Sequence, residues 1–449
     1  MSAAPLLRGY GDHPVFAYRQ GRAVGVAEYL RHVAQVAAAL PERRHLLNVC
    51  ADRYHFAVGF GAALVRGQLS LLPPNVTPDL IERLVSRYPD VYCLSDQGPG
   101  PAGLETLPFP AVAAGGSATP AVPAIPEAQP AVSVFTSGST GEPVPYRKTW
   151  GSLVRSALAE LDRLGTLAQP GTAVLGTVPP QHSYGLESTV LMVMQGGLAM
   201  HASRPFFSAD VRTELESLPR PRCLVTTPTH LRVLLSEPEE LSRVDLVLCA
   251  TAPLSPQLAM QAESRFSAPL HEIYGCTEAG QIASRRTTET EEWRALAGVT
   301  LRADRQGTWV NGGHIESEIL LSDVVELRGR GRFLMHGRTA DLVNIAGKRT
   351  SLAHLNYHLN SIEGVLDGVF VLPEEDGDAV ARLMAFVVAP THTAQTLMNE
   401  LRQRIDAAFL PRPLCFVEAL PRSVTGKLPR RALDQIMSGV SARMENGTP

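Results

Sequence analysis

The hydrophobic pattern of the first hundred residues alternates between helical and strand-like spacing. Apolar residues recur at helical spacing over 26–40. Continuous apolar runs of strand length follow at 46–49, 69–72 and 91–94. The stretches between these runs, 56–65 and 78–88, are long enough for crossover helices. Strands that alternate with helices predict parallel strands in an α/β sheet.

The same pattern divides the rest of the chain into three parts. Residues 97–130 are rich in Pro, Gly and Ala and predict an exposed connector. A second α/β stretch runs to residue 336, with apolar runs at 131–135, 174–178, 223–226 and 246–249. After it, strands are expected at 365–372, 383–388 and 414–417, with a helix at 394–409. Because 449 residues exceed one core, we predict a large domain over 1–336 and a small α+β domain over 337–449.

Composition and charge exclude several classes of protein. A net charge of −3, with 19% charged residues and no basic run, disfavours binding to nucleic acid. The longest apolar run, 56–65, is too short to span a membrane, and the first twenty residues do not look like an export signal. Six cysteines lack C-x-x-C spacing, which is typical of reduced thiols in a cytoplasmic protein.

A hydroxyl- and glycine-rich loop directly follows the apolar run at 131–135. Successive backbone N–H groups and uncharged hydroxyls in such a loop suit a phosphate group. The loop consists of Thr136, Ser137, Gly138, Ser139, Thr140 and Gly141. A P-loop of the G-x-x-x-x-G-K-[ST] type is the rival, but the Gly-Lys pairs at 347–348 and 426–427 lack the required neighbours.

Three further motifs follow in a fixed order: Tyr-Gly-Cys-Thr-Glu at 274–278, Gly-Arg at 337–338 through Gly-Lys-Arg at 347–349, and Gly-Lys-Leu-Pro-Arg at 426–430. With the loop, they resemble the adenylate-forming superfamily of acyl-CoA synthetases, adenylation domains and luciferases. The resemblance spans about 52–433. The sequence of residues 141–150 is most similar to that of short acyl or aryl acid:carrier-protein ligases of aryl-polyene and xanthomonadin-type pigment pathways.

This resemblance implies a large N-terminal domain of parallel and mixed sheets flanked by helices, followed by a small mobile α+β domain. It also implies that ATP and Mg²⁺ are used. The loop at 136–141 would hold the β- and γ-phosphates, Thr277 would contact the α-phosphate, and Glu278 would ligate Mg²⁺. Lys427 would bridge the substrate carboxylate and the α-phosphate.

The resemblance also places the rest of the nucleotide and the two other substrates. Adenine would lie between Tyr274 and the Thr251, Ala252 and Pro253 segment, beside Gly275, while Asp323 and Arg338 would bind the ribose. The acid pocket would be lined by His182, Tyr184, Gly185, Thr226, Thr227 and Gly280, and Gly347 would line the thiol channel.

Several residues allow a structural interpretation as well. His182 is either a gate beside the acid pocket or a buried histidine bound to a backbone carbonyl, and the second interpretation is favoured for His230 and His336. Cys276 is expected to line the pocket or pack. Lys148 is either solvated or close to a phosphate, and Arg328, Arg330 and Arg332 are expected to face solvent. Relative to the family, Ala340 stands at the hinge position and His354 replaces a glutamate.

The expected function is therefore ATP-dependent activation of a small carboxylic acid, with a hydroxybenzoate as the favoured substrate. The acceptor would be the phosphopantetheine thiol of an acyl carrier protein or, alternatively, coenzyme A. A non-catalytic adenylate sensor or scaffold is the hypothesis from another class, and the changes at Ala340 and His354 would suit it.

Overall fold

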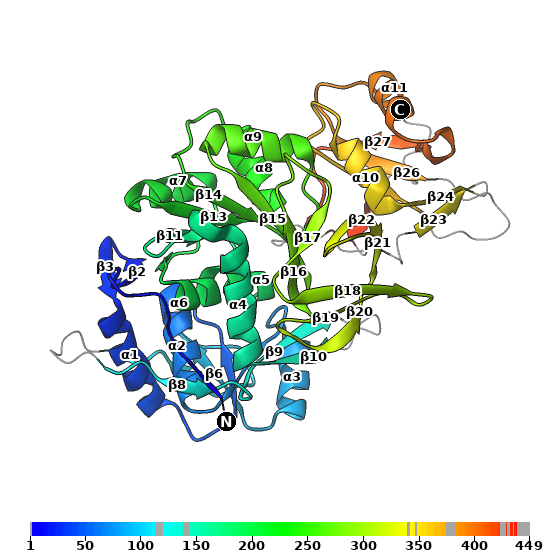
Figure 1. The fold of residues 1–449 in the computed structure, drawn as a ribbon. Helices are drawn as coiled ribbons and strands as arrows, with labels where there is room; N and C mark the ends of the chain where they lie inside the picture. Colours follow the sequence, from blue (N-terminus) through cyan, green and yellow to red (C-terminus); the bar gives the residue numbers. More distant parts are fainter. Residues whose placement is uncertain are drawn as a thin grey trace.

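The computed structural model describes residues 2–112, 120–137, 143–338, 342–345, 348–373 and 383–422, with 428, 432–433 and 435–437. Two large sheets and a smaller C-terminal assembly of strands and helices form the architecture (Figure 1). The first two parts carry most of the residues predicted for the site. The mixed α/β fold predicted from the apolar pattern is confirmed.

The smaller of the two large sheets has the strand order β10-β9-β5-β4-β6-β7. The neighbours β4, β5 and β6 are parallel, as predicted, and β9 is parallel to β5. Their crossover helices are α2 (Arg53–Val65) and α3 (Pro78–Arg87). The strands are β4 (His45–Asn48), β5 (Leu69–Leu72), β6 (Val91–Ser95), β7 (Thr106–Pro108), β9 (Pro130–Ser137) and β10 (Pro143–Thr149).

The predicted connector at 97–130 contributes strands at two places. Strand β7 pairs with β6, and β8 (Ala124–Pro126) pairs with β1 (Ala3–Pro5). Ile125 of β8 is only 3% exposed. The other residues of β7 and β8 are partly or fully exposed, so Ile125 is the one exception to the expected exposure in these two strands.

The larger sheet has the order β21-β22-β17-β16-β15-β14-β13-β11-β12-β2-β3. From β2 to β15 its neighbouring strands are parallel, and the other pairs are antiparallel. The strands are β2 (Val15–Arg19), β3 (Arg22–Gly25), β11 (Ala173–Gly176), β12 (Ala199–His201), β13 (Arg222–Thr226), β14 (Leu246–Cys249), β15 (Leu270–Cys276), β16 (Gly280–Arg285), β17 (Trp293–Ala295), β21 (Asp323–Gly329) and β22 (Arg332–Arg338).

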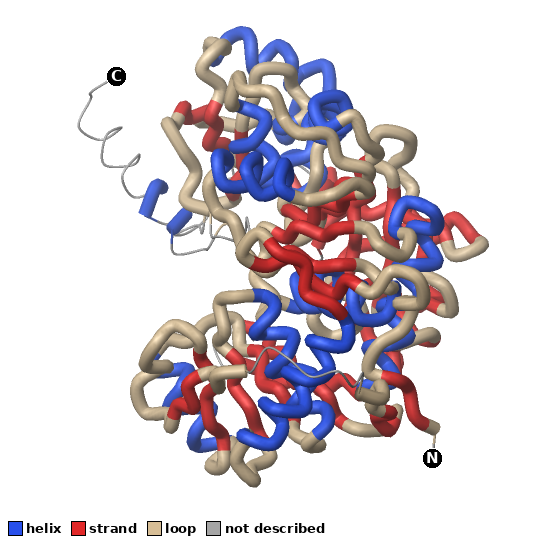
Figure 2. The backbone as a smooth tube through the Cα atoms, turned by 90° about the vertical axis from the view of Figure 1, so that its left-hand side faces the viewer, coloured by secondary structure: helices blue, strands red, loops and turns tan. Residues whose placement is uncertain are grey.

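Helices cover both faces of the larger sheet. Figure 2 shows helices beside the strands of the smaller sheet as well, in the lower half of the picture. Val174 of β11 belongs to a core shared with the smaller sheet and with α2, whereas the next residue, Leu175, belongs to a core with the outer helices. The helices of the shared core are α1 (Val26–Ala39), α2, α4 (Trp150–Leu164), η2 (Leu186–Leu191) and α6 (Met192–Gly196). The outer helices are α7 (Ser208–Ser217), α8 (Pro228–Ser236) and α9 (Pro256–Phe266).

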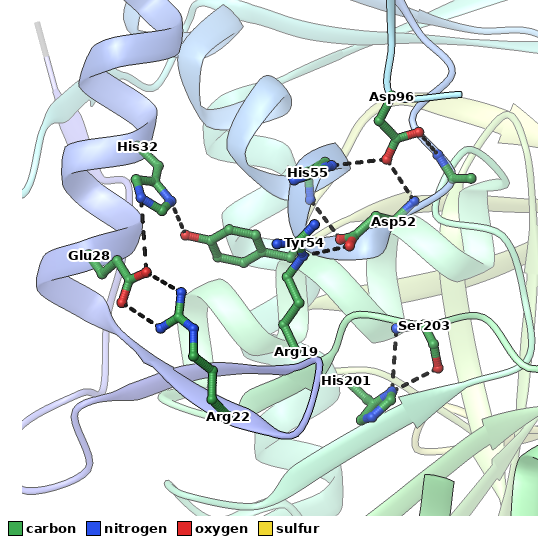
Figure 3. Close-up of polar contacts among 11 residues, drawn as sticks. Arg19, Arg22, Glu28, His32, Asp52, Tyr54, His55, Asp96, His201 and Ser203 are labelled. Carbon is green, nitrogen blue, oxygen red and sulfur yellow. Dashed lines mark hydrogen bonds and ion pairs between the residues drawn. The ribbon is translucent and has the colours of Figure 1, made fainter. Parts of the chain in front are cut away.

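A chain of polar contacts joins the two sheets near the start of α2 (Figure 3). Arg19 of β2 contacts Asp52, with 2.6 Å between Nε and Oδ2, and Asp52 caps α2 by accepting from the His55 backbone N–H. The His55 ring contacts Asp96 at 3.0 Å, and Asp96 also accepts from the backbone N–H of Ala51. The ends of β4 and β6 are thereby held against the larger sheet.

The C-terminal assembly has a hydrophobic core of its own, built from residues between 343 and 414. Its helix α11 ends at Arg404, earlier than predicted, because Ile405 adopts an extended backbone conformation. The elements are β23 (Leu342–Ile345), β24 (Lys348–Ser351), α10 (Leu352–Asn360), β25 (Asp367–Val371), β26 (Met384–Val388), α11 (Ala394–Arg404) and β27 (Leu414–Phe416). Strand β22 runs through the predicted boundary at 336/337, which stays a prediction.

The cysteines agree with the sequence analysis. Cys50, Cys93, Cys223 and Cys249 are buried, and all six cysteines are free thiols. In the described part of the chain, no helix combines the length and the apolar composition needed to cross a bilayer.

Candidate active site

The predicted site residues follow the carboxyl ends of neighbouring parallel strands in the larger sheet. Strand β13 ends at Thr226, β14 is followed by Thr251, and β15 ends at Cys276. Because β13, β14 and β15 are parallel neighbours, their carboxyl ends lie along one edge of the sheet. Ligands of open α/β sheets bind outside this edge.

Two residues predicted for the nucleotide are in direct contact. The Tyr274 hydroxyl donates a hydrogen bond to Asp323 Oδ2 at 2.7 Å, although 49 positions separate them. One side of the Tyr274 ring packs near Trp293 and Phe333, with centroid distances of 5.6 and 6.0 Å. Asp323 is also the register partner of Arg338 across β21 and β22. The backbone thus assembles the residues predicted for adenine and ribose, and their contacts with a nucleotide stay predictions.

The segment after β14 has a strained backbone at Thr251. Its φ of 84° lies in the left-handed region, where a β-branched residue is an outlier. Ala252 and Pro253 follow it at the surface, and the Leu254 N–H donates to the carboxylate of Glu272 at 3.2 Å. Strain of this kind is typical of functional sites, because the surroundings must hold the backbone in place.

Thr277 and Glu278 lie in the turn that joins β15 to β16, and both are partly exposed. A Cβ atom on Gly275 would lie 2.3 Å from the carbonyl oxygen of Gly280, so glycine is required for the two strands to approach here. Burial raises the pKa of Cys276 to about 12, with the charge of Glu278 acting in the same direction. Cys276 is therefore a thiol at neutral pH, which fits the packing role expected for it.

The phosphate loop connects β9 to β10 as a hairpin, with Ser137 paired to Pro143 and Thr136 to Val144. Its central residues, Gly138, Ser139, Thr140 and Gly141, lie outside the described residues, as do Gly347 and Lys427. The roles predicted for them stay predictions. The strands of the hairpin nevertheless lie next to the Glu278 turn, because the ammonium of Lys148 on β10 donates a hydrogen bond to the carbonyl oxygen of Glu278.

Four of the residues predicted for the acid pocket lie on two adjacent segments. His182 directly precedes α5 (Ser183–Gly185), in which Tyr184 is buried, and α5 continues into η2, a π-helix. Short π-helical segments often occur at functional sites. Gly280 begins β16 with a φ of 81°, and a Cβ atom there would lie 3.1 Å from a carboxylate oxygen of Glu187 on η2. The structure therefore places η2 against the start of β16.

Replacing Gly185 with alanine is expected to destabilise the fold by about 1–3 kcal/mol, because the added Cβ would lie 1.9 Å from the carbonyl oxygen of Pro179. That carbonyl accepts the N–H of His182, so the His182 loop must shift. Thermal unfolding would measure the loss, and the KM for the acid should rise. Gly11→Ala is the control, since nothing lies within 4 Å of its added Cβ. Equal melting temperatures for Gly185→Ala and the wild type would contradict the predicted loss of stability.

Thr226 and Thr227 are buried and belong to a network of hydroxyl groups. The Thr177 hydroxyl contacts that of Thr226 at 3.0 Å. The Nδ1 of His230 lies 3.2 Å from the Thr177 hydroxyl and 3.1 Å from that of Thr227. The expectation that His230 binds a backbone carbonyl is therefore wrong, because the ends of β11 and β13 bring threonine hydroxyls closer. Burial lowers the pKa of His230, which favours the neutral ring.

The expectation for His336 is also wrong. Its side chain is 45% exposed and contacts the carboxylate of Glu326 at 3.0 Å, because both residues lie on the edge pair β21 and β22. Arg328, Arg330 and Arg332 are exposed, as expected. Arg328 also contacts Glu326, and Arg332 contacts Glu292 at 3.3 Å.

The sequence analysis missed two buried ionisable residues beside the Glu278 turn. Glu187 is 6% exposed, and burial raises its pKa to about 7 against the opposing charge of Lys148. His314 is 4% exposed, and burial lowers its pKa to about 4. A signal for Glu187 exists, since it is the one charged residue in the apolar stretch 186–194. His314 has no such signal, because it lies in a polar stretch.

The described residues fit the nucleotide and the metal that the motifs imply. The carboxylate of Asp323 is held by Tyr274 and suits ribose hydroxyls. Within the described ranges no three His, Cys, Asp or Glu side chains form a metal cluster. Mg²⁺ that bridges phosphates needs only one or two carboxylates, so Glu278 beside the phosphate hairpin fits it.

Comparisons with known proteins identify the family. The AMP-binding enzyme family matches residues 42–305, more than half of the chain, and the chain belongs to it. A 4-coumarate–CoA ligase of Rhodobacter capsulatus is 30% identical over 305 residues, covering 66% of this chain and 74% of the relative. A 3-hydroxybenzoate–CoA/4-hydroxybenzoate–CoA ligase of Thauera aromatica is 23% identical over 402 residues, covering 78% and 74%.

Solved structures agree on the fold. The o-succinylbenzoate CoA synthetase of Bacillus subtilis, in complex with its acyl-adenylate intermediate, superimposes with a TM-score of 0.77 at 17% identity, covering 96% of this chain and 98% of that one. The resemblance to adenylate-forming enzymes is therefore confirmed. The protein is an adenylate-forming acid–thiol ligase.

Proposed function

We propose that the acid is aromatic, carries a ring hydroxyl, and is transferred from its adenylate to a phosphopantetheine thiol. The observation that carries the substrate proposal is the hydrogen-bonded group of Thr177, Thr226, Thr227 and His230 at the carboxyl edge of β11 and β13. Hydroxyls and a neutral imidazole can both donate and accept hydrogen bonds, which suits a phenolic hydroxyl. The relatives named for 4-coumarate and hydroxybenzoate support an aromatic acid.

The reaction would take place in two steps. A carboxylate oxygen attacks the α-phosphorus of ATP and pyrophosphate leaves; the thiolate sulfur then attacks the acyl carbon and AMP leaves. Both partners of the first step are anionic, so alignment and charge neutralisation are the main catalytic needs. The phosphate hairpin, Thr277 and Lys427 would supply them, while Glu278 would hold the Mg²⁺ that neutralises phosphate charge.

ATP–pyrophosphate exchange with a panel of acids tests the substrate proposal. The panel contains benzoate, 3- and 4-hydroxybenzoate, cinnamates, fatty acids and amino acids. We expect a hydroxybenzoate to exceed benzoate by about 5- to 150-fold, since one polar contact is worth roughly 1–3 kcal/mol. Thr226→Val, which removes a hydroxyl from the network, should reduce this ratio. Exchange with fatty acids or amino acids alone would contradict the proposal.

The acceptor is tested with coenzyme A and a phosphopantetheinylated carrier protein as separate thiols. The relatives named as CoA ligases support coenzyme A. The sequence of residues 141–150, through its resemblance to acid:carrier-protein ligases, supports a carrier protein as the acceptor. Mass spectrometry of the thioester product distinguishes them, with the unmodified carrier protein as the control. Adenylate formation without a thioester on either thiol would contradict the second half of the proposal.

A further inference from the structure

Lys148 connects two segments that contact the nucleotide in the proposed function. It is the sixth residue of β10, the strand that follows the phosphate loop, and its ammonium donates to the carbonyl oxygen of Glu278. The residue is partly buried. Burial lowers the pKa of Lys148, while the charge of Glu187 opposes this most strongly.

Glu187 is the carboxylate whose charge most strongly favours the charged form of Lys148 and so raises its pKa. Its carboxylate accepts from the Ser183 hydroxyl at 3.3 Å and lies against Gly280, two positions after Glu278. Glu316 also acts on Lys148, but Glu316 is already bound by the Thr149 hydroxyl and lies 3.9 Å from Arg155. Among the carboxylates that act on Lys148, Glu187, at the start of the helix that follows His182, has the largest effect.

We infer that Lys148 is a positioning residue for adenylation, whose ammonium fastens the Thr277–Glu278 turn to the strand that carries the phosphate loop, with Glu187 as its counter-charge. This rests on the proposed roles of the turn and the loop. A lysine suits the task because its flexible stem reaches across two strands and its compact ammonium fits beside a carbonyl. Since a hydrogen bond from a charged group is among the stronger ones, its loss frees the turn.

Four variants test this. Lys148→Met keeps the length of the side chain and removes the donor, and Lys148→Arg keeps the charge. Arg147→Met is the matched control, because Arg147 is exposed on the same strand. The double variant Lys148→Met with Glu187→Gln removes both charges and so avoids an uncompensated buried carboxylate. Exchange kinetics, calorimetric binding of ATP without acid, and thermal unfolding are measured for each.

For Lys148→Met we expect kcat/KM for ATP to fall about tenfold or more and ATP binding to weaken, while KM for the acid changes less than about twofold. Lys148→Arg should recover most of the loss, and Arg147→Met should match the wild type. The double variant should be no worse than Lys148→Met, because the two residues act as one unit.

Wild-type kinetics and ATP affinity in Lys148→Met would overturn the inference. So would equal losses in Lys148→Met and Lys148→Arg that follow their melting temperatures, since those indicate a purely structural role. If the wild type shows no exchange with any acid, the proposed function fails, and calorimetric ATP binding still decides the role of Lys148.

Discussion

Replacing Asp323 with alanine is expected to weaken ATP binding about a hundredfold. In the proposed site the carboxylate accepts hydrogen bonds from the ribose hydroxyls while Tyr274 holds it in place. Hydrogen bonds to a charged group contribute about 1.5–3 kcal/mol each, and a loss of about 3 kcal/mol corresponds to roughly a hundredfold. Calorimetric titration with ATP measures this directly and does not depend on the identity of the acid.

Two further variants separate recognition of ribose from the stability of the strand. Tyr274→Phe keeps the ring and removes only the contact with Asp323, so its effect on ATP affinity should be much smaller. Glu326→Gln alters an exposed carboxylate of the same strand, β21, and should leave ATP affinity unchanged. An Asp323→Ala protein that binds ATP with wild-type affinity would show that the ribose contact has been misassigned.

Parallel strands were predictable wherever a continuous apolar run reports burial on both faces of a sheet. The runs at 46–49, 69–72 and 91–94 became β4, β5 and β6 with the predicted orientation. The pairing of β2 with β12 was not predictable, because more than 180 positions separate the two strands. Hydrophobic period specifies which face of a strand is buried, and long-range pairing depends on the packing of the whole core.

The candidate site likewise combines contacts that were predictable from the sequence with contacts that were not. The family resemblance implied that Tyr274 and Asp323 serve one nucleotide, and the structure joins the two residues through a hydrogen bond. The contact of Lys148 with Glu278 was not predictable, since the acceptor is a backbone carbonyl and any residue type offers one. The exposure of His336 was missed for a related reason, because a strand next to the edge of a sheet has the same local pattern as a central one.

Lys427→Ala is expected to reduce adenylation about a thousandfold while leaving ATP affinity within a few-fold of the wild type. The substrate carboxylate and the α-phosphate are both anions, and their mutual repulsion grows as the reacting atoms approach. A cation placed between them acts mainly in the transition state, and the loss of one such contact costs about 2.7–4 kcal/mol. Binding of ATP, which depends on the loop and on Asp323, would persist.

Pyrophosphate exchange isolates this step, because it reports formation of the adenylate without any thiol acceptor. Lys427→Arg keeps the charge on a less adaptable group and should retain only part of the rate. Arg402→Ala, on the exposed face of α11, is a matched loss of positive charge and should exchange at the wild-type rate. Because repulsion between the two anions is independent of the acid chosen, the loss in Lys427→Ala should be similar for every acid that the enzyme accepts. A loss confined to one acid would instead assign Lys427 to recognition of that substrate.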